Sequence, residues 1–363
     1  MRKSVAKAAA HMKKYLLLYS ILAIVIGIII GYRYHIFFKI HKDLIKNIII
    51  SLAILTIYPS MIQLKLERIG IAAKKIKAIV LSMFYIFVLS PITAIAFSTV
   101  IPNTDVAMGY VVSNVVPASS ASIGYVLLVD GDIELATVLA VLSLFGSLIA
   151  VPGYLNVYSS VTSASVPLGK TMEALVYTLV IPFILGQVTR YLAIRHTIKK
   201  KREEYRPNGK DGTTLAHELE EDFKLFERKI VKELESSIKP HLSLATMISM
   251  LVLICMLAAS KAFMMINSPN IAFMVIGLQA VMLFMILGVV TVSDRSMHMS
   301  YSEHEAIAFI SATKNQSVAA AIAVMALGPG AALVPALVPA IQAPVAIAYV
   351  NLSDSIRKMF GGV

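Results

Sequence analysis

The chain is 363 residues long, carries a formal net charge of +12 and has a mean hydropathy of +0.77, with 58% hydrophobic residues. This composition excludes a water-soluble globular domain and is typical of a polytopic helical membrane protein. The single cysteine, Cys255, lies in an apolar run, so no intramolecular disulfide can form and we expect an inert, packed thiol. No P-loop, zinc-protease, serine-hydrolase or kinase motif is present, so we expect no enzymatic activity and no cofactor.

Ten apolar segments approach the length of about 20 residues that a membrane-spanning helix requires. In chain order they cover residues 15–31, 45–64, 77–101, 106–129, 133–157, 171–194, 241–263, 270–293, 305–327 and 330–351. We therefore expect a cytoplasmic segment 1–14, a membrane region 15–194, a charged connector 195–240, a second membrane region 241–352 and a cytoplasmic tail 353–363. Apolar residues recur at helical spacing between the charges of the connector, which predicts an amphipathic helix in the cytoplasm or on the membrane surface.

The charges of the loops predict the orientation of the chain. With ten spans and the N-terminus inside, the cytoplasmic regions hold about 26 of the 33 Lys and Arg residues. Because cytoplasmic loops of membrane proteins carry an excess of positive charge, we expect a multi-pass protein of the cell membrane with both termini in the cytoplasm. The same bias explains the net positive charge without any binding of nucleic acid.

The second half of the chain repeats the pattern of the first. Segments 2 to 5 correspond to segments 7 to 10 with an offset of about 195 residues, and segment 1 corresponds to segment 6. Five spans is an odd number, so the second half enters the membrane from the opposite side. The predicted fold class is therefore all-α, with about ten transmembrane helices in two inverted five-helix repeats.

Segments 4 and 9 each have a polar centre. Segment 4 contains Pro117, which removes a backbone donor and breaks or kinks the helix. Segment 9 contains Lys314 between polar neighbours, and a lysine in the middle of a membrane is costly unless it lines a cavity or serves a site. Because the two polar centres occupy equivalent positions in the repeat, we predict that helices 4 and 9 are broken and cross at a substrate site.

The candidate substrate- and ion-binding residues are Asn114, Pro117, Ser119, Ser120, Ser122, Lys314, Asn315, Gln316 and Ser317. We assign proton coupling to Lys314, because burial favours release of its proton, and we expect its charge to face an anionic or polar substrate. The alternative is a lysine that only satisfies carbonyls of the broken helix. The amides and serines either bind the substrate or join packed helices, and Asn114 alternatively bonds the carbonyls that Pro117 frees.

Two groups of charged residues lie at the predicted cytoplasmic ends. Asp130, Asp132 and Glu134 are interpreted as caps of segment 5 rather than as ligands. A second group precedes segment 9 and is interpreted as a solvated polar loop, with gating or proton relay as the alternative. It consists of Asp294, Arg295, His298, Glu303, His304 and Glu305.

In their order and spacing these motifs resemble the bile acid/sodium symporter superfamily, and within it the arsenite permeases of arsenical resistance. The likeness covers nearly the whole membrane part. It is carried by Tyr58-Pro59 at the end of segment 2, Pro117 followed by Gly131-Asp132, Asn315-Gln316 before an Ala-rich helix, and Pro339 and Pro344 in segment 10. The resemblance implies a secondary transporter with its substrate between helices 4 and 9.

The chain departs from these relatives at positions that matter for chemistry. The arsenite permeases have a cysteine after the fourth-helix proline, where this chain has Ala118, and a glutamate after the paired amides, where it has Val318. The sodium-coupled relatives use a ninth-helix Glu and a fourth-helix Asn as sodium ligands, which correspond here to Ser311 and Ile123. We therefore expect protons rather than sodium to drive transport.

The predicted function is secondary active export of arsenite or a similar small oxyanion in exchange for protons. One alternative is an ion-coupled symporter for an organic anion. Another is a non-transporting membrane sensor whose charged connector binds a partner, although a sensor needs no pair of polar breaks at the midplane. The expected partners are thus the small anion, protons and the lipid bilayer.

Overall fold

The computed structural model describes residues 2–66, 75–119, 121–162, 166–204, 216–328 and 330–361, which include all the predicted site residues except Ser120. Over these ranges the protein is all-helical, without a β-sheet. The one β-type contact in the described part of the chain is an isolated antiparallel bridge between Ala118 and Lys314.

The first half of the chain builds twelve elements up to the connector, two of which are π-helical turns that continue a helix. They are α1 (Arg2–Lys14), α2 (Leu16–Arg33), α3 (His35–Ile40), α4 (Lys42–Gln63), α6 (Ile76–Phe84), η2 (Tyr85–Leu89), α7 (Ser90–Ser98), α8 (Thr104–Val115), α9 (Ser122–Leu128), α10 (Ile133–Thr162), α11 (Leu168–Leu175) and η3 (Val176–Val180).

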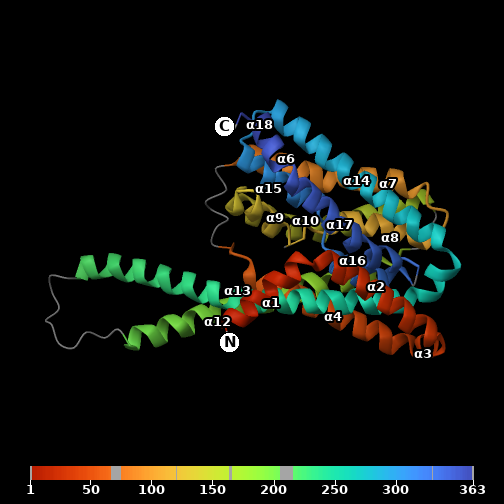
Figure 1. The fold of residues 1–363 in the computed structure, drawn as a ribbon, viewed down its shortest axis with the longest axis horizontal. Coiled ribbons are helices and arrows are strands. Elements are labelled where there is room, and N and C mark those ends of the chain that lie inside the picture. The colour runs from red at the N-terminus through yellow and green to blue at the C-terminus, as the bar shows by residue number, and fades with distance from the viewer. Residues whose placement is uncertain are drawn as a thin grey trace.

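The second half begins with two helices that reach far beyond the membrane segments predicted for them. Its elements are α12 (Ile181–Glu204), α13 (Ala216–Asn267), α14 (Pro269–Ser296), α15 (Tyr301–Ala312), α16 (Gln316–Ile322), η4 (Ala323–Leu327), α17 (Leu333–Asn351) and α18 (Ser353–Met359). The predicted boundary at residue 240 falls inside α13, which is 52 residues long and continues through Pro240. The amphipathic part of the connector and segment 7 are therefore one helix, and its charged end projects from the body (Figure 1).

Seven helices among the described residues are long and apolar enough to cross a membrane, or eight if the bent pair of α1 and α2 counts as one span. The prediction of about ten spans exceeds this number for a physical reason. Segments 4 and 9 are each divided into two helices, α8 with α9 and α15 with α16, and neither half is long enough to cross alone. All ten predicted apolar segments nevertheless contain helix.

The helices form two layers (Figure 1). One, called here the α13 layer, contains α1, α2, α4, α12 and α13, and α13 contacts both α2 and α4. The other, called here the α14 layer, contains α6 to α10, α14, α15 and α17. Helix α16 lies between them, because it contacts α4 on one side and α8 and α17 on the other.

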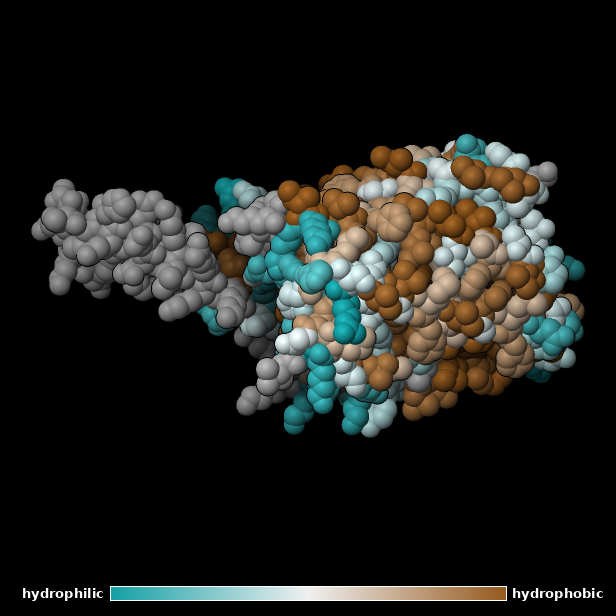
Figure 2. All heavy atoms as spheres, turned by 90° about the horizontal axis from the view of Figure 1, so that it is seen from above, coloured by the Kyte–Doolittle hydropathy of each residue, from teal (hydrophilic) through white to brown (hydrophobic). Residues whose placement is uncertain are grey.

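The surface has the pattern of a membrane protein. In the view of Figure 2, apolar residues dominate the middle of the body and hydrophilic residues gather at its two ends. Large apolar side chains such as Ile149, Phe273 and Val292 are exposed, which lipid tolerates and water does not. Both termini and the projecting ends of α12 and α13 lie toward the same end of the molecule (Figure 1).

Two glycines allow α2 and α13 to pack backbone against backbone. A Cβ atom at Gly31 would lie 2.0 Å from the carbonyl oxygen of Ala259, and one at Gly27 would lie 2.4 Å from that of Cys255. Two glycines four residues apart form the small-residue motif by which membrane helices approach closely. Both glycines belong to segment 1 of the sequence.

Candidate functional site

The two broken segments cross at their breaks. Helix α8 ends at Val115 and α9 begins at Ser122, while α15 ends at Ala312 and α16 begins at Gln316. The short extended stretches between them run antiparallel and share two backbone hydrogen bonds. The amide of Ser119 donates to the carbonyl of Thr313 at 3.0 Å, and the amide of Asn315 donates to the carbonyl of Pro117 at 2.9 Å. Each break therefore satisfies backbone groups that the other leaves free.

Gln316 satisfies the carbonyl that Pro117 frees. A proline cannot donate to the carbonyl four residues earlier, which here belongs to Ser113. The Nε2 atom of Gln316 donates to that carbonyl at 3.0 Å, and the next carbonyl, of Asn114, accepts from Ser90 Oγ at 2.9 Å. The prediction had offered this supporting role to the side chain of Asn114, which is directed elsewhere.

Asn114 is paired with a glutamine of α14. Its Nδ2 donates to the carbonyl of Tyr110 at 2.9 Å and to Gln279 Oε1 at 3.0 Å, while its Oδ1 accepts from Gln279 Nε2 at 3.0 Å. The side chain is 1% exposed and lines neither cavity described below. Asn114 thus fixes α8 against α14.

Lys314 makes hydrogen bonds through its backbone, whereas its charged side-chain end makes none among the described residues. Gln342 of α17 accepts from the Lys314 amide at 3.0 Å and donates to the Lys314 carbonyl at 3.2 Å, so one side chain satisfies both backbone groups. The residue is 1% exposed, and its Nζ atom has no hydrogen-bond partner among the residues that the structure describes. A buried ammonium without a partner is strongly unfavourable.

The contacts around the two breaks correspond to each other in the two halves of the chain. Ser143 of α10 accepts from the Ala118 amide at 3.1 Å, as Gln342 of α17 does from the Lys314 amide. A second correspondence relates the Asn114–Gln279 pair to a contact of 3.4 Å between Ser311 Oγ and Ser82 Oγ. In each correspondence the equivalent residues are about 195 positions apart in the sequence, which is the offset expected of the repeat.

A cavity of about 80 Å³ lies beside the crossing, between the two layers. Its polar wall comes from the breaks, α4 and α17, and its apolar wall comes mainly from α13. Lys314 is the one charged residue among the described residues that line it. The lining comprises Thr56, Ser60, Ser119, Ala121, Thr246, Met250, Leu253, Ile254, Leu257, Lys314, Asn315, Gln316, Ser317, Pro335, Pro339 and Gln342.

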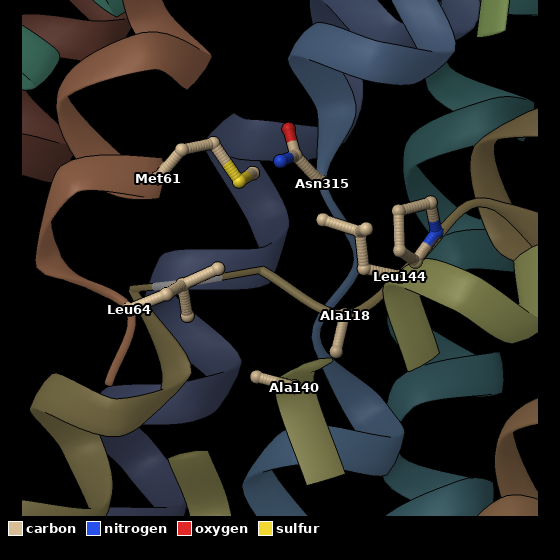
Figure 3. Close-up of a pocket in the computed structure, with 7 residues that line it drawn as sticks. Met61, Leu64, Ala118, Ala140, Leu144 and Asn315 are labelled. Carbon is tan, nitrogen blue, oxygen red and sulfur yellow. The ribbon is translucent and has the colours of Figure 1, made fainter. Parts of the chain in front are cut away.

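A second cavity, of about 10 Å³, lies on the other side of Asn315 (Figure 3). Its remaining lining is apolar: Met61, Leu64, Pro117, Ala118, Ala140 and Leu144. The side chains of Met61 and Asn315 point toward each other across it (Figure 3). Ala118, which replaces the thiol expected from the arsenite permeases, therefore faces this water-sized apolar space and does not line the larger cavity.

The predicted site residues divide between the cavity and its support. Ser119, Lys314, Asn315, Gln316 and Ser317 line the larger cavity. Ser122 is buried and its hydroxyl is hydrogen-bonded to that of Thr313. The prediction missed the polar lining residues Thr56, Ser60, Thr246 and Gln342. Their signal was an isolated polar residue in an apolar segment, which a crowded membrane interior tolerates only with a partner or a role.

The charged residues before segment 9 do not form a solvated loop, so that prediction was wrong for three of them. Asp294, His304 and Glu305 are each 0% exposed. For His304 and Glu305 the reason is that α15 begins at Tyr301 behind a capping box of Ser300 and Glu303, which places both residues inside a packed helix. Asp294 lies on α14 and is buried against His304 and Tyr85. Nearby, the Asp132 carboxylate accepts from the Leu135 amide at 2.9 Å, so the capping role predicted for it is confirmed.

The arrangement of broken helices around a buried polar cavity is typical of secondary transporters. Residues 49–215 match the model of the Sodium Bile acid symporter family. This match runs from α4 through α12 and includes the first broken segment. No curated protein matches the chain. Over these residues the match supports the resemblance to this family and, with it, a secondary transporter of several membrane spans rather than an enzyme. The narrower likeness to arsenite permeases stays a prediction.

Proposed function

We propose that the protein is a proton-coupled secondary transporter of a small anion, which binds at the crossing of the two broken segments. The observation that carries the proposal is Lys314, a residue that lines the larger cavity and whose buried Nζ atom lacks a partner among the described residues. A positive charge in that position needs either an anion or the loss of a proton. The paired contacts at the two breaks support two inverted five-helix repeats around this site.

The lining of the cavity favours an organic anion over arsenite. Hydroxyl and amide groups beside Lys314 can hold an acidic head group, while Met250, Leu253 and Leu257 of α13 offer an apolar surface to the rest of the molecule. Burial of each methylene group on such a surface is worth about 0.8 kcal/mol. A fully hydroxylated oxyacid would gain nothing from this wall. The lining thus favours the predicted alternative of an organic anion over the first prediction.

The charge on the substrate decides the mode of coupling. An anion neutralises protonated Lys314, so the loaded site crosses the membrane without net charge, and the empty site returns with a neutral amine. Anion and proton then move in the same direction. Uncharged arsenous acid would instead bind the neutral amine and exchange with a proton, as first predicted. The first scheme follows from the high cost of moving an uncompensated charge through the bilayer. The second scheme carries that cost, because the protonated lysine returns without a counter-anion.

No carboxylate lines the larger cavity among the described residues, which supports protons over sodium as the coupling ion. Sodium needs several oxygen ligands, and the two family positions for its carboxylate and amide ligands are occupied here by Ser311 and Ile123. The ammonium of Lys314 would also repel a neighbouring cation. We therefore expect a sodium gradient to drive no transport.

The first test is transport into everted membrane vesicles under an imposed pH gradient or sodium gradient. The two probes are arsenite and hexanesulfonate, an anion that stays charged and carries an apolar chain. We expect hexanesulfonate to accumulate with proton influx and Lys314→Met to abolish it. A second measurement, the thermal midpoint of the purified protein, should rise with hexanesulfonate in the wild type and not in Lys314→Met.

The outcomes separate the candidates. Exchange of arsenite for protons without movement of hexanesulfonate would reverse the assignment of the substrate. Transport driven by sodium, or transport by Lys314→Met with unchanged pH dependence, would contradict the role of Lys314. Lys170→Met is the matched control, because this lysine lies outside the cavity on α11.

A further inference from the structure

A second group of ionisable side chains lies buried away from the cavity, at the end of the molecule where both chain termini lie. Asp294 belongs to α14, and His304 and Glu305 belong to α15. All three are 0% exposed and line neither cavity. A buried ionisable group keeps its charge only with a partner, and otherwise holds the neutral form. The hydrogen bonds of the group therefore indicate where protons are held.

A chain of hydroxyl groups fixes the hydrogen on one nitrogen of His304. Thr291 Oγ1 lies 2.7 Å from the carbonyl oxygen of Leu287, which can only accept, so the threonine hydroxyl donates there. Thr291 then accepts from the Tyr349 hydroxyl at 2.6 Å. The Tyr349 oxygen in turn accepts from His304 Nε2 at 2.9 Å. All three contacts are hydrogen bonds only if Nε2 carries a hydrogen.

The other nitrogen shares a further proton with Asp294. His304 Nδ1 lies 2.8 Å from Asp294 Oδ2. Because Nε2 already carries a hydrogen, this contact needs a proton as well, either as imidazolium with carboxylate or as imidazole with carboxylic acid. Tyr85 donates to the second carboxylate oxygen at 3.2 Å. The pair is thus neutral overall and holds one proton that can be released.

Glu305 follows directly in the helix. Neither of its carboxylate oxygens has a hydrogen-bond partner within the described part of the chain. The turn between α9 and α10 packs on it, since a Cβ atom at Gly131 would lie 3.0 Å from the Glu305 Cβ. Burial opposes the ionised carboxylate more strongly than the Tyr301 hydroxyl and the Arg357 charge favour it. A bound proton removes that cost.

The C-terminal helix closes this group from the outside. The ring of Phe360 stacks on that of His304 with centroids 4.4 Å apart. Arg357 lies over the ring of Tyr301 at 4.7 Å and pairs with Asp130 at 3.0 Å. The other titratable or charged groups around the three residues are Tyr85, Tyr301, Tyr349 and Arg357, with Lys75, Asp130, Asp132 and Glu303 in the ion pairs beyond.

We propose that His304 with Asp294, and Glu305 beside them, form a second proton-binding site that is separate from Lys314 and covered by α18. The half-helix α15 carries this site near its start and Lys314 just past its end, about 15 Å apart at 1.5 Å per residue. We infer the proton-binding site from these contacts and from burial. A role for it in carrying the transported proton rests on the proposed function.

Infrared spectroscopy of the purified full-length protein tests Glu305. A protonated carboxylic acid gives a carbonyl band that an ionised carboxylate lacks, and this band shifts in heavy water. We expect Glu305→Gln to remove one such band near neutral pH. Glu303→Gln is the matched control, because Glu303 is ion-paired with Lys75 at 3.1 Å and is expected to be ionised. An unchanged carboxylic acid band in Glu305→Gln would overturn this part of the proposal.

The pH dependence of thermal unfolding tests the His304–Asp294 pair. Because the folded protein holds a proton that an unfolded histidine releases near pH 6.5, the wild-type midpoint should fall as the pH rises above that value. Asp294→Asn can still hydrogen-bond His304 but shares no proton, so its midpoint should fall less steeply than that of the wild type, and protonated Glu305 accounts for the slope that remains. The exposed Asp354→Asn is the control and should keep the full wild-type slope. Parallel profiles of all three proteins would overturn the proposal.

Failure of the second site is distinguishable from failure of the proposed function. If the infrared band and the alkaline slope are present but vesicles transport no probe, the site stands and proton-coupled transport falls. If both signals are absent while transport depends on Lys314, the transporter stands and this site falls.

Discussion

At the scale of single residues, the site depends on side chains that satisfy broken backbone. Gln342 bonds both the amide and the carbonyl of Lys314, so it positions the lysine without touching its charge. Gln316 donates a hydrogen bond to the Ser113 carbonyl, which Pro117 leaves free. In a bilayer the backbone groups of a broken helix cannot hydrogen-bond to water, and such side chains provide the hydrogen bonds instead.

We predict that Gln342→Leu destabilises the protein, because it leaves two backbone groups of Lys314 without partners. An unsatisfied buried group costs about 1–3 kcal/mol, so the thermal midpoint of the purified protein should fall and anion binding should weaken. Gln63→Leu is the control. Among the described residues the Gln63 side chain makes one hydrogen bond, to the Pro59 carbonyl in its own helix, and it lines neither cavity. An equal loss in both variants would contradict the special role of Gln342.

At the scale of elements, the contact between α2 and α13 depends on Gly31. A Cβ atom there would lie 2.0 Å from the carbonyl oxygen of Ala259, so a larger residue must push the helices apart. We predict that Gly31→Leu lowers both the thermal midpoint and the yield of folded protein. Gly277→Leu should lower neither, because an added Cβ at Gly277 in α14 meets no described atom within 4 Å. Equal yields of the two variants would contradict close packing at α2.

Ion pairs join the start of α6 to the turn before α10 and to the start of α15. Lys75 Nζ lies 2.6 Å from Asp132 and 3.1 Å from Glu303. Partial burial opposes its charge, but the hydrogen bonds to the two carboxylates outweigh burial and raise the pKa of Lys75. Burial also opposes the charge of Asp132, but the Leu135 amide and Lys75 outweigh it and lower the pKa of Asp132.

These shifts predict a loss of stability in acid. A carboxylate with a lowered pKa stabilises the folded state above its usual pKa of 3.8, and this stabilisation is lost as the pH falls through the lowered value. Lys75→Met should therefore be less stable than the wild type at pH 7 by about 0.2–1 kcal/mol, a small value because Lys75 is partly exposed. The difference should shrink below pH 4, as measured by thermal unfolding in detergent. Lys358→Met changes an exposed residue of α18, and its difference in stability from the wild type should not shrink below pH 4.

At the scale of the whole molecule, the proposed substrate site lies between two layers of different character. The crossing of the broken segments supplies the charge, whereas α13 supplies most of the apolar wall and α4 of the same layer adds two hydroxyl groups. A relative movement of the layers would expose the cavity to one side and then to the other, as alternating access requires.

We predict that Met250→Gln weakens transport of hexanesulfonate, because it replaces part of the apolar wall with an amide. Loss of about one methylene contact corresponds to roughly 0.8 kcal/mol, or about a fourfold rise in KM. Met247→Gln is the matched control, since Met247 lies on the same helix but does not line the cavity. A similar rise in both variants, or no rise in either, would argue against α13 as part of the substrate site.

The sequence by itself determined the membrane class, the ten apolar segments and the two polar breaks. These follow from local rules, because a bilayer requires long apolar runs and because Pro117 and Lys314 are out of place in them. Five of the predicted site residues do line the cavity. The sequence also carried the glycine pair of α2, a signal that our prediction left unused.

Only the tertiary structure decided which polar side chains serve the cavity and which serve packing. Asn114 and Ser122 had the same local signals as Ser119, yet they turn toward Gln279 and Thr313 and away from the cavity. Asp294 and His304 had the composition of a solvated loop, yet they are buried together because α14, α15, α17 and α18 converge on them. A hydrogen-bond partner on another helix leaves no periodic trace in the chain, so these assignments exist only once the helices pack.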